Sequence, residues 1–175
     1  MQIDRIAEWD LQPEIEIQIA ELLGGAFETD FGGRSYFMQR PHLRYVAQRD
    51  GRLIGHLSLT YRAIRIGARL CTVAGVCDVA TLQAARGQGV AGLLLQAAMQ
   101  DAQSSPAEFI LLFGDAGLYG AAGFHPVDNL LHYVDMSGAQ TGQMKTANDD
   151  GLMVLPLRGA VWDHTVQIDL LGPLF

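Results

Sequence analysis

The sequence is poor in cysteine, which limits its capacity to form disulfides. The 175 residues include two cysteines, Cys71 and Cys77, six residues apart. We expect the segment between them to be extended, which separates them by roughly 20 Å at about 3.3 Å per residue. Because a disulfide needs Cα atoms within about 7 Å, the spacing predicts two free thiols in a reducing compartment.

Signals for membranes and export are missing as well. No stretch approaches the roughly 18 uninterrupted apolar residues of a membrane helix. Residues 1–5 lack the basic-then-apolar order of a signal peptide, and Asp4, Glu8 and Asp10 argue against a transit peptide. We therefore expect a cytoplasmic protein with no membrane partner.

Basic residues are scarce too. The chain has 12 Lys and Arg against 19 Asp and Glu, a formal net charge of −7. Nucleic-acid binding needs clustered Lys and Arg against the phosphates, so this balance argues against such a partner. With no CxxC motif and no His-rich cluster, we expect no metal site. By contrast, hydrophobic residues make up 49%, enough for one packed core, and the length suits a single domain over residues 1–175.

Hydrophobic periodicity predicts a mixed α/β chain. Apolar residues on one face predict a helix over residues 13–27, although the alternation from Ile15 to Ile19 leaves a strand open. Strands are predicted around residues 45–47 and over 53–61, joined by a turn at Asp50-Gly51. The polar positions of the second strand are His56, Ser58 and Thr60. A further tight turn is expected at Gly67, and a flexible stretch over residues 137–151.

The middle of the chain predicts a βαβ unit. Residues 71–81 are nearly all apolar, as in a strand buried on both faces. A helix is predicted from Val90 to about Gln103, and residues 109–113 form a second buried strand. A strand, a Gly-rich turn, a helix and another strand give parallel pairing.

The Gly-rich turn, Arg86-Gly87-Gln88-Gly89-Val90-Ala91-Gly92, is the segment best suited to bind an anion. The N-terminus of a helix carries unpaired backbone N–H groups and about half a positive charge, and glycines admit a bulky ligand. The glycines also match the G-x-G-x-x-G fingerprint of dinucleotide-binding domains. That fingerprint goes with an acidic residue at the end of a strand about 20 residues later, whereas Glu108 comes before its strand. A plain helix start remains the alternative.

Arg86-x-x-Gly89-x-Ala91 resembles the Q/R-x-x-G-x-G/A signature of the GNAT (GCN5-related N-acetyltransferase) superfamily. Residues 79–81 resemble the end of that family's fourth strand, and the likeness covers roughly residues 40–128. It implies a three-layer fold whose central sheet is mixed and mostly antiparallel, with a parallel βαβ cofactor unit flanked by helices. It also implies acetyl-CoA as cosubstrate, bound by Val79, Ala80, Thr81, Arg86, Gly87, Gln88, Gly89, Val90 and Ala91.

A second motif follows the fifth predicted strand. Tyr119-Gly120-Ala121-Ala122-Gly123-Phe124 is similar to the family's Tyr-x-x-x-Gly-Phe element. The resemblance makes Tyr119 the catalytic candidate, a general acid for the departing thiolate, since a phenol pKa near 10 is close to that of a thiol. A packed aromatic beside Phe124 is the alternative.

The residue that takes the proton from the amine is less obvious. Where related enzymes carry a glutamate on the fourth strand, this sequence has Cys77. The neighbouring Asp78 should point to the opposite face unless the strand bulges. Water and backbone carbonyls, His56 or His125 are other options. Cys77 itself is either an acyl-carrying nucleophile or a buried structural cysteine.

The resemblance implies that the loop of residues 30–37 borders the acceptor, which makes Phe31, Cys77 and Asp78 candidates for substrate binding. Trp162, Asp163 and residues 169–175 line an acceptor pocket or belong to core and tail. Nodulation N-acyltransferases and 2′-acting aminoglycoside N-acetyltransferases have a similar order of short motifs to that at residues 40–47, 55–56 and 66–67. Residues 149–157 also resemble a late strand of the aminoglycoside enzymes.

The leading hypothesis is transfer of acetyl from acetyl-CoA to a primary amine of a small molecule. A CoA-binding sensor with little turnover and a long-chain N-acyltransferase remain alternatives. The resemblance is compatible with a homodimer.

Overall fold

The computed structural model describes residues 1–175, and the chain gathers into two compact units. Residues 1–60 and 77–101 form the first unit, and residues 61–76 and 102–175 form the second. Two long strands, β3 (Arg52–Ile66) and β4 (Arg69–Thr81), and helix α2 (Val90–Ser104) each contribute to both. The single domain expected from the sequence remains a prediction.

The first unit is built on an antiparallel ladder. Strand β2 (Leu43–Arg49) pairs on one side with β1 (Gln2–Ala7) and on the other with β3. Asp50 and Gly51 connect β2 to β3 with φ values of 51° and 74°. Two positive φ angles are what a tight two-residue hairpin turn requires, so the Asp-Gly signal is confirmed.

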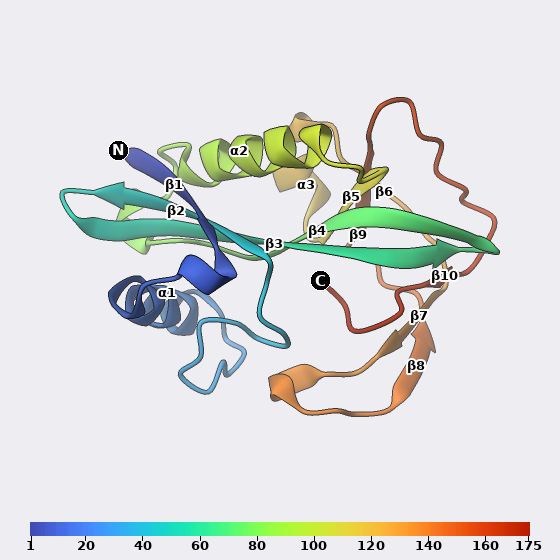
Figure 1. Ribbon diagram of the computed structural model, residues 1–175, viewed down its shortest axis with the longest axis horizontal. Coiled ribbons are helices and arrows are strands. Elements are labelled where there is room, and N and C mark those ends of the chain that lie inside the picture. The colour runs from blue at the N-terminus through green and yellow to red at the C-terminus, as the bar shows by residue number, and fades with distance from the viewer. The chain divides into compact units, whose positions relative to one another are not determined.

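Helices cover both faces of this ladder. Helix α1 (Pro13–Ala26) begins with a proline in its first turn and buries Ile19, Leu22 and Leu23 in a cluster that includes Val46. In Figure 1, α1 and α2 lie on opposite sides of β2 and β3. On the α2 side, a Cβ on Gly55 would lie 2.5 Å from Val90 Cγ1, so only glycine permits this approach. The helix predicted over 13–27 is confirmed, and the alternative strand is wrong.

The second unit contains the parallel pair. Strand β5 (Phe109–Phe113) pairs parallel with β4, in register from Val73–Phe109 to Val76–Leu112. The ladder ends there, although β4 continues to Thr81. Antiparallel strands β9 (Leu152–Pro156) and β6 (His125–Pro126) follow β5, while β10 (Ile168–Asp169) joins the end of β3 to the hairpin of β7 (Leu131–Val134) and β8 (Met144–Ala147). The predicted βαβ unit and the mixed, mostly antiparallel sheet are confirmed.

Short helices occupy several connections, and one strand lies in a stretch that was expected to be flexible. The short helices are η1 (Glu8–Asp10), η2 (Gln83–Ala85), α3 (Ala116–Tyr119), η3 (Gly120–Ala122) and η4 (Ser137–Ala139). Strand β8 falls within the stretch 137–151 that was expected to be flexible; all four of its residues are exposed. It therefore shows no alternation from which a strand could be recognised. No helix combines the length and apolar content needed to cross a membrane.

The core of the second unit decides between two interpretations of Trp162. This side chain is 5% exposed, and its ring meets Phe109 edge-on with centroids 5.1 Å apart. Its indole N–H donates to Asn129 Oδ1 at 2.8 Å. Trp162 is thus a core residue with its polar atom satisfied.

Candidate functional site

The Gly-rich turn at the start of α2 has the geometry of an anion site. Gly87 and Gly89 have φ values of 74° and 78°, and a Cβ at either position would meet no atom within 4 Å. The backbone N–H groups of Gly87, Gln88 and Gly89 donate no hydrogen bond within the protein. Open space, free donors and a helix N-terminus together favour an anionic ligand.

Arg86 adds a positive charge to this turn. Its side chain is exposed, and its Nε donates to the carbonyl oxygen of Thr81 at 3.4 Å. That bond ties Arg86 to the end of β4 and leaves the terminal nitrogens of its guanidinium available. Gln88 donates from its side chain to the carbonyl of Ala84 at 3.0 Å, which closes the turn. The residues present therefore fit a pyrophosphate.

The end of β4 contains an irregularity at Asp78. This residue has a φ of 51°, in the left-handed region that non-glycine residues seldom adopt. As a result, Asp78 and its neighbour do not point to opposite faces. The Ser58 hydroxyl lies 3.2 Å from Asp78 Oδ2 and 3.3 Å from Cys77 Sγ. The strand departs from regular geometry at Asp78, and because Ser58 lies near both side chains, the expectation of opposite faces is wrong.

The carboxyl of Asp78 lies in surroundings that raise its pKa. Burial raises the pKa of its carboxyl to about 6, while the hydrogen bond from Ser58 and the charge of Arg44 act in the opposite direction. A carboxylate with a pKa near the working pH is well matched to proton transfer. Asp78 is partly exposed.

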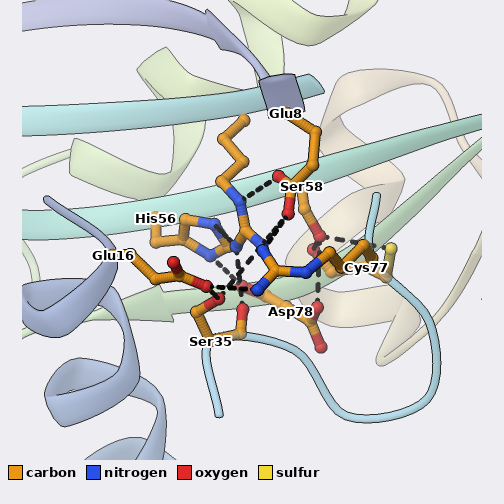
Figure 2. A network of polar contacts seen from close by, with 9 residues as sticks. Glu8, Glu16, Ser35, His56, Ser58, Cys77 and Asp78 are labelled. Carbon is orange, nitrogen blue, oxygen red and sulfur yellow. Dashed lines mark hydrogen bonds and ion pairs between the residues drawn. The ribbon is translucent and has the colours of Figure 1, made fainter. Parts of the chain in front are cut away.

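A buried network of polar groups lies behind Asp78 (Figure 2). Its centre is Arg44, whose side chain is 0% exposed. Arg44 binds Glu8 through two nitrogens, Nε to Oε2 at 2.6 Å and Nη2 to Oε1 at 2.9 Å. It also donates to the carbonyl and the hydroxyl of Ser35, at 2.8 Å and 3.2 Å, and contacts His56 Nε2 at 3.2 Å. The buried charge is therefore paired and fully hydrogen-bonded.

The environment of His56 removes it from the list of candidate bases. The ring is completely buried, with Nδ1 2.8 Å from the carbonyl oxygen of Asp78. Burial and then the charge of Arg44 lower its pKa to about 3. Both ring nitrogens are occupied, so His56 has no free site at which to accept a proton. His125 lies in the second unit, on β6.

The two cysteines differ in exposure, and both are free thiols, as predicted. Cys71 is buried, and burial raises the pKa of its thiol. Cys77, for which burial was expected, is partly exposed. The Cys77 sulfur lies 3.3 Å from Ser58 Oγ, and its role as an acyl-carrying nucleophile stays a prediction.

Tyr119 lies in the second unit at the end of α3. Asp115 caps this helix by accepting from the N–H of Gly117 at 2.6 Å. The Tyr119 ring meets Phe124 at 6.2 Å in an edge-on arrangement, and burial raises the pKa of its phenol. Its hydroxyl makes no hydrogen bond within the protein. The packing role is present, and the acid role stays a prediction.

A hollow of about 580 Å³ opens in the first unit between α1 and residues 33–40. This volume is within the range of small-molecule sites. Its lining includes Glu16, Glu21, Arg34 and Tyr36. Phe31, in contrast, is 5% exposed, with its ring 5.4 Å from those of Phe27 and Phe37. Contact between Phe31 and a substrate stays a prediction.

Sequence reasoning missed Arg44, Ser35, Glu8 and Ser58 as parts of the site. Arg44 stands beside Leu43 at the start of a short apolar run, where an arginine is typical of an exposed strand end. Its burial follows from partners distant in sequence, so no local pattern signals it. No group of three His, Cys, Asp or Glu side chains gathers as metal ligands would.

Comparisons with known proteins agree with this geometry. A family model described as "Acetyltransferase (GNAT) domain" matches residues 10–127. No curated protein matches the sequence.

Solved structures with the same fold include three bacterial acyltransferases. The GNAT family N-acetyltransferase YhbS from Escherichia coli, in complex with CoA, has a TM-score of 0.64 at 18% identity, covering 97% of this chain and 89% of that one. A Brucella melitensis GNAT acetyltransferase in complex with acetyl-CoA gives 0.62 at 17%, covering 95% and 94%. An acyl-CoA N-acyltransferase from Pseudomonas aeruginosa gives 0.55 at 23%, covering 73% and 90%. At these identities the likeness establishes the fold.

Proposed function

The chain belongs to the GNAT acetyltransferase family, and on that premise we propose that it transfers acetyl from acetyl-CoA to a primary amine of a small molecule. The observation that carries this proposal is the open turn at Gly87 and Gly89, with its unpaired N–H groups at the start of α2. The two similar structures with CoA and acetyl-CoA support the choice of cosubstrate.

The cosubstrate supplies an acetyl group activated by a thiol leaving group. We assign its pyrophosphate to the N–H groups of residues 87–91 and to the guanidinium of Arg86. Residues 79–81 are assigned to the pantetheine arm, because β4 continues beyond the last residue paired with β5. An extended arm can add to such a strand through backbone hydrogen bonds.

Asp78 is the proposed proton acceptor. An ammonium group has no lone pair, so the acceptor must lose a proton before its nitrogen can bond to the acetyl carbon. The Asp78 carboxylate takes this proton and releases it to solvent. The neutral nitrogen then bonds to the acetyl carbon as the C–S bond breaks, and Asp78 takes the second proton that the nitrogen loses. Tyr119 is the proposed donor to the departing thiolate and regains its proton from solvent.

The first test is calorimetric titration with acetyl-CoA of the wild type and of Gly89→Val. At a φ of 78°, a β-branched residue strains the backbone by about 1–2 kcal/mol, so we expect binding to weaken about tenfold or more. Gly92→Ala is the matched control, since a Cβ there meets nothing within 4 Å and no positive φ is involved. No binding by the wild type, or equal binding by all three proteins, would refute the cosubstrate site.

The second test replaces Tyr119 with Phe and follows release of the CoA thiol with small primary amines, among them ethanolamine, putrescine and glycinamide. We expect kcat to fall by about 10- to 100-fold, less than for a poor leaving group, because a thiolate departs readily. Packing against Phe124 is kept, so the melting temperature should stay within about 2 °C. A CoA-binding sensor would show no turnover to lose.

A further inference from the structure

His56 has only one protonation state and one tautomer compatible with its neighbours. The carbonyl oxygen of Asp78 can only accept, so the Nδ1 atom 2.8 Å from it carries a hydrogen and donates. The guanidinium of Arg44 can only donate, so the Nε2 atom 3.2 Å from Nη1 must accept. A hydrogen on both nitrogens would set two donors against each other. His56 is therefore a neutral imidazole with its hydrogen on Nδ1.

The guanidinium that imposes this tautomer is itself fixed. Glu8 holds Arg44 by two hydrogen bonds, and Ser35 accepts from it at its carbonyl and its hydroxyl. Arg44, His56 and Ser58 are each 0% exposed. A buried group with several charge-assisted bonds cannot rotate without leaving donors unpaired, so the orientation is rigid. Figure 2 shows Glu8, Ser35 and His56 converging in this way.

This chain of contacts ends at the one residue of β4 that departs from strand geometry. Asp78 has a φ of 51°, a conformation that persists only where its surroundings impose it. His56 binds the carbonyl of Asp78, and Ser58 binds its carboxylate at 3.2 Å. In a regular strand, Asp78 and Cys77 would face opposite sides. The two contacts from β3 keep the carboxylate on the side where the thiol of Cys77 also lies.

We propose that His56, oriented by Arg44, is a positioning residue that holds the carbonyl of Asp78 and thereby aims the Asp78 carboxylate at the acceptor amine. This inference rests on the proposed function, in which Asp78 takes the proton from the amine. His56 never carries the proton itself. Its contribution is geometric, and a small displacement of a reacting group is enough to lower the rate strongly.

The charged groups around Asp78 determine whether a substitution at His56 changes the pH dependence of the rate. Arg44 faces it from β2, His56 and Ser58 from β3, and Cys77 precedes it on β4. Glu8, Glu16 and Arg40 lie beyond Arg44. Because His56 is neutral, replacing it with another neutral side chain leaves these charges unchanged. The midpoint of the acid side of the pH–rate profile should therefore stay in place.

Two substitutions separate positioning from packing. His56→Asn puts an amide N–H near the place of Nδ1 and keeps the bond to the Asp78 carbonyl, while His56→Gln puts an amide near Nε2 and keeps only the contact with Arg44. Each loses one buried contact, so we expect similar losses in melting temperature. The kcat of His56→Gln should fall about 10- to 100-fold, and that of His56→Asn should stay within about threefold of the wild type, both with an unchanged KM for acetyl-CoA.

The measurements are kcat and KM against pH, with the amine that gives the fastest thiol release, and the melting temperature of each variant. Equal kcat in both variants, a kcat that follows the melting temperature, or an acid limb that vanishes in His56→Asn would overturn the inference. An inactive wild type would instead refute the proposed function and the inference with it.

The tautomer can be tested without turnover. Long-range ¹H–¹⁵N spectra of the wild type should show His56 neutral with its hydrogen on Nδ1 between pH 5 and 8. If His56 titrated in this range, or carried its hydrogen on Nε2, the positioning role would be overturned even if His56→Gln failed to fold.

Discussion

Replacing Asp78 with Asn is expected to lower kcat by about 10²- to 10⁴-fold while making the protein more stable at pH 8. The amide keeps the shape of the side chain and can still accept the hydrogen bond from Ser58, which lies 3.2 Å from Oδ2. It cannot take a proton from the amine. Binding of acetyl-CoA, measured by calorimetry, should be unchanged, because the Gly-rich turn is untouched.

The pH dependence of this variant identifies the titrating group. Burial raises the pKa of Asp78 to about 6, so the wild-type kcat should rise with pH through a midpoint near that value as the carboxylate forms. In Asp78→Asn the residual rate should show no such rise. A variant that keeps both the wild-type rate and its acid limb would exclude Asp78 as the proton acceptor.

The gain in stability follows from the same pKa. A carboxyl whose pKa is about 6 when folded and about 3.9 when unfolded favours the folded state below pH 4, and this contribution is lost as pH rises through 6. At pH 8 the folded state therefore bears a cost of a few kcal/mol, as an order of magnitude. Asn removes that cost, so Asp78→Asn should melt several degrees higher at pH 8 and near the wild type at pH 4.

The control for this comparison is Asp10→Asn. Asp10 is exposed at the end of η1, and surface substitutions of this kind are usually within about 0.5 kcal/mol of neutral. It changes the net charge by the same amount as Asp78→Asn. If both variants gained the same stability at pH 8, the effect would come from net charge and not from burial of Asp78.

Hydrophobic periodicity predicted the helices and strands that bury apolar residues on one face or on both. Helix α1, strands β3 to β5 and helix α2 each bury several apolar residues, and all were recognised. Strand β8 was not, because its residues are all exposed and hydrogen bonding alone defines it. Local sequence carries the burial pattern of an element but not the ladder that an exposed segment joins.

The candidate site was predictable only where a local motif encodes it. Glycines and an arginine at the start of α2 mark the cofactor turn directly. The positive φ at Asp78 carries no such mark, since it accompanies contacts with β3, about twenty residues away. His56 and Ser58 looked like the polar face of a strand, yet both are 0% exposed. Their burial is tolerated because Arg44 and Asp78 supply hydrogen-bond partners.

Replacing Arg44 with Met should destabilise the protein by about 3–5 kcal/mol, a large part of the 5–15 kcal/mol that typically holds a domain together. Methionine fills much of the volume but removes the hydrogen bonds that Arg44 donates to the Glu8 carboxylate, the Ser35 carbonyl and His56 Nε2. For a chain of this size, the melting temperature should fall by roughly 10 °C. Thermal and urea unfolding measure the loss.

Arg40→Met is the matched control for this change. Arg40 also pairs with Glu8, at 2.8 Å, but its side chain is 50% exposed. Exposed pairs are worth about 0–1 kcal/mol, so the same substitution should cost little there. Equal losses at Arg40 and Arg44 would show that burial of the ion pair is not what makes Arg44 important.

A double-mutant cycle with Glu8→Gln separates loss of the pair from loss of its surroundings. Glu8 is bound by Arg44 through two hydrogen bonds, so Arg44→Met leaves a carboxylate that keeps only its exposed partner, Arg40. Neutralising Glu8 in the same protein removes that carboxylate's charge. The double variant should therefore lose less stability than the sum of the two single variants, by about 1–3 kcal/mol. Additive losses would mean that Arg44 stabilises the fold through Ser35 and His56 instead of through Glu8.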